Sequence, residues 1–142
     1  MATFELANTV QSAIYTEENV QQILNAASQV VDIPAHFLFS IAIVTDEEIQ
    51  PLNKQYRQKD YPTDVLSFRY DDKSGEIVIS DDRIREQAME YGNTVHEEGM
   101  FMLVHGILHI MGWDHERSEE EDSEQRALEV QILNLCGLKC AR

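Results

Sequence analysis

The chain has 142 residues, which is the size of one domain. Hydrophobic residues make up 43% of it, enough for a buried core, so the composition excludes a disordered chain. The formal net charge of −15 argues against broad binding to nucleic acid or to anionic membranes. That charge is uneven, because residues 54–85 contain seven cations and seven acids, and the flanking segments hold the whole excess of acids.

No targeting or membrane segment is expected. The first 20 residues include Glu5, Glu17 and Glu18, and they lack the basic start and the apolar stretch of a secretion signal. No run approaches the roughly 20 apolar residues of a membrane span. Cys136 and Cys140 do not make a disulfide framework, so we expect two free thiols and a cytoplasmic protein.

The first half of the chain predicts alternating strands and helices. Thr16 and Thr45 are each followed by acidic residues, the pattern of a capped helix start. Apolar residues then recur at helical spacing after Thr16. The predicted elements are an edge strand at 2–7, a helix from Thr16 to before Pro34, a buried strand at 37–44, and a helix from Thr45 to about Tyr56 that contains Pro51.

The second half predicts a hairpin and three helices. The elements are a polar loop at 57–63, strands at 65–70 and 76–80 joined by a turn, a helix from Ser80 to about Tyr91, a helix from Thr94 through the apolar stretch 100–111, and a last helix from Ser118 to Gly137 with Ala127, Leu128, Ile132 and Leu135 on its buried side. This order predicts an α+β fold in a single compact domain over residues 1–142. We expect a mixed sheet of about four strands with five to six helices.

Three of the five histidines lie in one eleven-residue window, HGILHIMGWDH. His105 and His109 are four residues apart, so on a helix they share one face. Gly112 allows the helix to stop and the chain to return His115 to the same ion. Three neutral imidazoles with one open position are typical of a catalytic zinc site. The surrounding residues are apolar, so the rings are expected to be buried, where one metal ion satisfies both.

The histidine spacing matches that of metzincin peptidases, H-E-x-x-H-x-x-G-x-x-H. In those enzymes the glutamate after the first histidine is the general base, but Gly106 stands at that position here. Asp114, next to His115, is the nearest replacement base, and it is also placed to orient an imidazole. Asp114 is equally well explained as a turn or cap residue. A bound metal lowers the pKa of its water to about 7.

Arg57 is the second candidate functional residue. It lies in the charge-neutral segment, within the string NKQYRQKDYPTDVLSF at residues 53–68. A planar guanidinium suits bidentate contact with phosphate. Taken alone, an arginine here is more often a solvated surface cation, and it is the pairing with the histidine motif that favours a functional role.

Together these strings resemble the YbeY family of bacterial rRNA maturation factors, which are metal-dependent endoribonucleases. The matching segments are LNKQYRQKDYPTDVLSF at 52–68, GEIVIS at 75–80 and LVHGILHIMGWDHE at 103–116. The resemblance implies a compact α+β unit with a zincin-like metal site. It maps the three zinc-binding histidines onto His105, His109 and His115, and the arginine implicated in RNA processing onto Arg57. Two departures are Glu76, where the family more usually has aspartate, and DSEQRALE in the last helix, where it often has a methionine.

The resemblance also implies the function. It indicates one zinc ion per chain and cleavage of single-stranded RNA in maturing 16S rRNA, near its 3′ end, and in ribosome quality control. The implied partners are the rRNA precursor and the small ribosomal subunit with its assembly proteins, without DNA or membrane. Two alternatives stay open: a metal-dependent peptidase-like hydrolase, and a non-catalytic ribosome-assembly factor with a structural metal.

Overall fold

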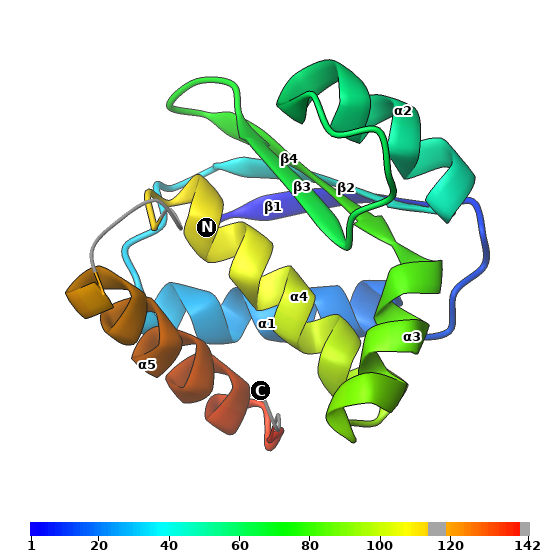
Figure 1. Ribbon diagram of the computed structural model, residues 1–142. Coiled ribbons are helices and arrows are strands. Elements are labelled where there is room, and N and C mark those ends of the chain that lie inside the picture. The colour runs from blue at the N-terminus through cyan, green and yellow to red at the C-terminus, as the bar shows by residue number, and fades with distance from the viewer. Residues whose placement is uncertain (114–118, 140–142) are drawn as a thin grey trace.

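The structure is a computed structural model that describes residues 1–113 and 119–139 (Figure 1). Within these residues it has four strands and five helices. In chain order they are β1 (Thr3–Asn8), α1 (Glu17–Val30), β2 (Leu38–Val44), α2 (Asp46–Arg57), β3 (Val65–Arg69), β4 (Ser74–Ser80), α3 (Asp81–Tyr91), α4 (Val95–Ile110) and α5 (Glu119–Leu135).

Side-chain caps start four of the helices at the residues that the sequence predicts. The hydroxyl oxygen of Thr16 accepts from the Asn19 N–H at 3.1 Å, and Ser80 caps α3 in the same way. Thr45 and Thr94 each form a capping box with the glutamate three residues later. The predicted start of the last helix, Ser118, lies outside the described residues.

The four strands form one mixed sheet in the order β1-β2-β4-β3. β1, β2 and β4 run parallel, and β3 pairs antiparallel with β4 as the second arm of a hairpin. β1 and β3 are therefore the two edges. The predicted edge position of the first strand is confirmed, and the second edge, β3, borders the site described below.

The sheet separates two layers of helices (Figure 1). On one face, Phe39, Ile41 and Ile43 of β2 join the main core that α1 and α4 cover, and α5 packs against those two helices. On the other face, Val78 of β4 packs with Ile49 of α2. Such alternation along a strand is the period of two that a sheet requires. No described helix combines the length and apolar character needed to cross a membrane.

Most of the predicted architecture is confirmed. The α+β class, the single compact domain, the four-stranded mixed sheet, the hairpin and the five helices all agree with the expectation. α2 continues through Pro51 as predicted. β4 begins at Ser74 rather than at residue 76, because Leu38 already pairs with Ser74 in the sheet.

The predicted buried side of the last helix is wrong in part. Ala127 is exposed, and Leu135 is 53% exposed. α5 instead turns Gln125 and Glu129 inward, together with Ile132 and Leu133. The physical reason is that this rotation buries Ile132 and Leu133 in the core and places Gln125 and Glu129 against His105 of α4.

Candidate functional site

Helix α4 carries two of the three predicted metal ligands. Almost every residue from 98 to 110 on this helix is buried. His105 and His109 are exceptions, since both are half-buried and lie one turn apart on the same helix face. Both line a cleft between α4 and β3. The predicted placement of these two rings on one face of a buried helix is confirmed, but the rings are half-buried rather than buried, because that face borders the cleft.

Gly106 lets α4 approach the sheet closely beside the histidines. A Cβ atom at this position would lie 3.0 Å from Cγ2 of Ile77 and 3.2 Å from the hydroxyl oxygen of Ser67. This is the position at which metzincins carry the catalytic glutamate. A larger side chain at residue 106 requires Ile77 or Ser67 to move. The packing here therefore leaves little room for the glutamate that metzincins carry at this position.

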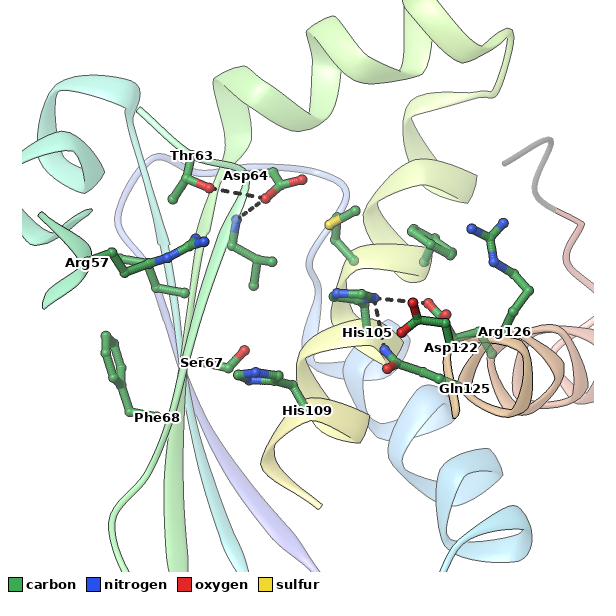
Figure 2. A pocket seen from close by; sticks show the side chains of 15 residues that line it. Arg57, Thr63, Asp64, Ser67, Phe68, His105, His109, Asp122, Gln125 and Arg126 are labelled. Carbon is green, nitrogen blue, oxygen red and sulfur yellow. Dashed lines mark hydrogen bonds and ion pairs between the residues drawn. The ribbon is translucent and has the colours of Figure 1, made fainter. Parts of the chain in front are cut away.

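Helix α5 holds the ring of His105. Nδ1 of His105 lies 3.1 Å from Oε2 of Glu129 and 3.4 Å from Nε2 of Gln125, the two contacts dashed at His105 in Figure 2. Both partners are buried and lie one helical turn apart on α5. The other nitrogen of the His105 ring points into the cleft (Figure 2). The Nδ1 side of the ring is therefore held by α5, and its other nitrogen faces the cleft.

Arg57 reaches the same cleft from the opposite side. It is the last residue of α2, and Gln58 ends that helix in the left-handed conformation. Figure 2 shows Arg57 on the α2 side of the cleft, with the two histidines on the α4 side. The cleft has a volume of about 710 Å³. Its lining residues are Arg57, Thr63, Asp64, Val65, Leu66, Ser67, Phe68, Phe101, Met102, His105, His109, Asp122, Gln125, Arg126 and Glu129.

The edge strand β3 offers backbone groups to this cleft. The Tyr70 N–H donates to the Ser74 carbonyl at 3.0 Å, and the Ser80 N–H donates to the Asp64 carbonyl at 2.9 Å. Alternate residues of an antiparallel strand direct their backbone groups to the partner strand. Ser67 lies three residues from both Asp64 and Tyr70, an odd number. Its N–H and carbonyl therefore point away from β4. β3 has no second neighbour in the described sheet.

The described lining of the cleft is not net positive. It contains Arg57 and Arg126 against Asp64, Asp122 and Glu129. Asp64 is engaged locally, since its carboxylate accepts from the N–H of Val65 at 2.7 Å and from Gln87 at 3.1 Å. A local positive potential would therefore depend on the two arginines and on a bound cation.

The remaining predicted site residues, His115 and Asp114, lie outside the described residues. The turn that leads to them does occur, since α4 ends at Ile110 and Gly112 adopts a positive φ of 104°. Within residues 1–113 and 119–139, no three His, Cys, Asp or Glu side chains converge as a metal site. The third histidine ligand stays a prediction.

Sequence reasoning missed Glu129 and Gln125 as site residues. A signal was present, because they share a helical face with Ile132 and Leu133, at steps of four, seven and eight residues from Gln125. The buried side predicted from the sequence, with Ala127, Leu128, Ile132 and Leu135, does not include them. Gln125 and Glu129 are buried where they contact His105 on α4. The periodicity of α5 alone carries no information about this distant residue.

The fold has a solved counterpart. The solution structure of TM1509 from Thermotoga maritima matches with a TM-score of 0.63 and 30% sequence identity, covering 94% of this chain and 90% of that one. This α+β architecture is thus one already seen in a protein from Thermotoga maritima.

Sequence comparison assigns the family. The model described as Endoribonuclease YbeY matches residues 5–137. The Endoribonuclease YbeY of Carboxydothermus hydrogenoformans is 43% identical over 129 residues, which covers 84% of this chain and 90% of that protein. The one from Bacillus licheniformis is 45% identical over 114 residues, covering 70% and 72% respectively. The chain therefore belongs to the YbeY endoribonuclease family, and the resemblance found in the motifs is confirmed.

Proposed function

We propose that this protein is a single-domain, metal-dependent endoribonuclease that cleaves single-stranded RNA. The observation that carries the proposal is one cleft of about 710 Å³ in which Arg57 faces His105 and His109. Membership of the YbeY family supports the same reaction class. A nuclease needs a metal or base beside a group that binds phosphate, and these three side chains supply both kinds.

The described histidines fit a divalent metal of the zinc type. His105 and His109 present two imidazoles on one helix face, and one ring is already fixed through Nδ1. With His115 they would hold one zinc ion per chain. When bound, zinc supplies Lewis-acid polarisation of a phosphoryl oxygen and lowers the pKa of water.

The chain's own residues would position the phosphate. Arg57 is exposed and makes no hydrogen bond or ion pair with any residue that the structure describes. Its guanidinium is thus available to hold a phosphate oxygen and to stabilise charge that develops on it. The outward N–H of Ser67 on β3 is a second donor at the same cleft.

An aromatic pair beside Arg57 suits unpaired bases. Tyr56 precedes Arg57 and is 53% exposed, and its ring centroid lies 4.9 Å from that of Phe68, which lines the cleft. Bases of single-stranded nucleic acid stack on aromatic rings, and a paired duplex does not offer its base faces. This surface supports single strands as the substrate.

The finer assignment follows the family resemblance. We propose that the substrate is a 16S rRNA precursor near its 3′ end, that the activity also serves ribosome quality control, and that both take place in the cytoplasm. The small ribosomal subunit and its assembly proteins would bring RNA to an acidic protein. Asp114 is proposed to orient an imidazole or to accept a proton near the metal.

A peptidase is the second candidate, and the edge strand favours it. An extended peptide can add to an open sheet edge, and β3 presents such an edge along the cleft. Against it, Gly106 supplies no base, and Ile77 and Ser67 leave little space for one. We therefore favour the nuclease over the peptidase.

The test compares two substrates with and without metal. We expect purified protein to cleave end-labelled single-stranded RNA, to lose the activity with a chelator and to regain it with zinc, and to leave casein intact. His109→Ala should be inactive, whereas His96→Ala, on the same helix but outside the cleft, should retain activity.

Other outcomes would overturn the proposal in distinct ways. RNA cleavage that survives both chelation and His109→Ala contradicts a metal mechanism. Cleavage of casein but not RNA selects the peptidase. If the protein unfolds without metal and cuts neither substrate, the metal is structural and the protein is an assembly factor.

A further inference from the structure

Glu129 is a buried carboxylate whose position on α5 is explained by one contact. Its side chain is 5% exposed, and it directs Oε2 toward Nδ1 of His105 at 3.1 Å. No other hydrogen-bonding partner of Glu129 occurs among the described residues. A buried carboxylate without a donor is strongly unfavourable, so this contact must supply the proton that the carboxylate accepts.

The contact decides which nitrogen of His105 carries the proton. An ionised carboxylate only accepts hydrogen bonds, so Nδ1 of the neutral ring must donate. The Nε2 of Gln125 is a competing donor to Nδ1, but it lies farther away, at 3.4 Å, and is uncharged. With the proton on Nδ1, the lone pair is on Nε2, the nitrogen that faces the cleft (Figure 2).

We propose that Glu129 is a positioning residue that holds His105 in the Nδ1–H tautomer, with Nε2 prepared to bind a divalent metal. The proposal rests on the metal-binding part of the proposed function and not on the identity of the substrate. Carboxylates that orient ligand histidines in this way raise both metal affinity and ring basicity.

The fold gives this contact a fixed geometry. On the same face of α5, one turn beyond Glu129, Ile132 and Leu133 are buried in the main core. α5 in turn packs against α4, which carries His105. The carboxylate is therefore held by helix packing, and the ring is prepared before any metal arrives.

The first test needs neither metal nor RNA. Nitrogen-15 NMR of the metal-free protein, at alkaline pH where imidazole is neutral, distinguishes the two tautomers, with His105→Gln to assign the signal. We expect His105 to be the Nδ1–H form in the wild type and to shift toward Nε2–H in Glu129→Leu. An Nε2–H ring in the wild type, which a neutral Glu129 donating to Nδ1 would give, overturns the proposal.

The second test measures zinc affinity by competition with a chromophoric chelator. We expect Glu129→Leu to weaken binding about 10–100-fold. Glu129→Gln, which keeps an acceptor oxygen, should weaken binding less and serves if the leucine variant does not fold. Glu124→Gln, an exposed acid on the same helix, should match the wild type. Unchanged affinity in both Glu129 variants contradicts the proposal.

The two proposals fail separately. If His105 is the Nδ1–H form and Glu129 variants lose zinc affinity but no RNA is cut, the positioning role stands and the nuclease assignment falls. If RNA is cut in a zinc-dependent manner while His105 is the Nε2–H form, the nuclease stands and the role of Glu129 falls.

Discussion

Arg57 differs from Lys54 in having no ionic partner among the described residues. Lys54, one turn earlier on α2, lies 3.8 Å from the Asp60 carboxylate. An exposed arginine at a helix end contributes little to stability. Arg57 lies on the wall of the cleft opposite His105 and His109, where a role in binding or catalysis explains it better.

The first prediction concerns the charge on Arg57. Arg57→Ala should lower kcat/KM for single-stranded RNA by about 10²–10³-fold, as loss of one group that stabilises transition-state charge does. Arg57→Lys should recover part of this, because lysine keeps the charge but not the bidentate geometry. Unfolding curves should match the wild type. A loss no larger than that of Lys54→Ala would contradict the role.

The second prediction concerns the β3–β4 hairpin, which carries Tyr70 and Glu76. The Tyr70 hydroxyl donates to the Glu76 carboxylate, and this hydrogen bond, helped by partial desolvation, raises the pKa of Tyr70 to about 12. The folded pKa exceeds the unfolded value of about 10, so the contact stabilises the fold below about pH 10 and is lost as pH rises toward 12.

An ultraviolet absorbance titration tests this contact. We expect the phenol step near pH 12 to disappear in Tyr70→Phe and to move toward the ordinary tyrosine pKa in Glu76→Gln. Titration of Tyr70 at its ordinary pKa in the wild type would show that the hydrogen bond is absent in solution.

At the scale of elements, the separation of α4 from the sheet controls where the histidines lie. Gly106 and Gly99 are both close-packed positions of this helix. A Cβ on Gly106 would press on Ile77 and Ser67 beside the cleft, whereas one on Gly99 would lie 2.3 Å from Cγ2 of Ile14, away from it. Substitutions at these two glycines therefore distinguish an effect on helix packing alone from an effect on the geometry of the site.

The third prediction uses this pair. Overpacking costs about 1–3 kcal/mol, offset by about 1 kcal/mol of better helix propensity for alanine. We expect Gly106→Ala to reduce zinc affinity along with any loss in stability, because α4 must move away from β3. Gly99→Ala should lower the stability without changing zinc affinity, as measured by denaturation and chelator competition. Equal zinc affinities in both variants would contradict this account.

The elements themselves were largely predictable because their signals are local. Thr16, Thr45, Ser80 and Thr94 each cap a helix through a bond to a residue three positions away, which a sequence pattern records. Ile132 and Leu133 mark an inward face of α5, but the contact that buries Glu129 on it was not predictable, because Glu129 lies 24 residues from His105 and only the folded chain brings them together.

At the scale of the molecule, the acidic charge limits where RNA can bind. The net charge is −15, and the described residues that line the cleft include two arginines and three acids. The described protein groups alone therefore do not make the cleft positive. A divalent ion held by neutral histidines would add two positive charges there.

The fourth prediction follows from this balance. Metal-free protein should bind labelled single-stranded RNA weakly, with a slope of log affinity against log salt no steeper than about −1.4, for two phosphate contacts at about −0.7 each. Arg57→Ala should reduce the slope by about 0.7. Fluorescence anisotropy measures both. Tight binding with a slope twice as steep would reveal a basic surface that the described residues do not provide.

The family and reaction class were predictable from the sequence because two motifs carry them, one around Arg57 and one around His105, which lies 48 residues later. Arg57 and His105 come together only through the sheet, since α2 reaches the cleft past one face of β3 and α4 lines it from the other. The motifs identify the candidate residues, and the topology of the sheet explains why these residues line the same cleft.

The central claim, that Arg57 and the α4 histidines act on one phosphate in one cleft, is tested most directly by a double-mutant cycle. We would measure kcat/KM for RNA cleavage with wild type, Arg57→Ala, His109→Ala and the double variant. Groups that act as a unit are strongly non-additive, so the double variant should lose far less than the product of the two single losses. Losses that multiply would show two independent contributions and contradict the account.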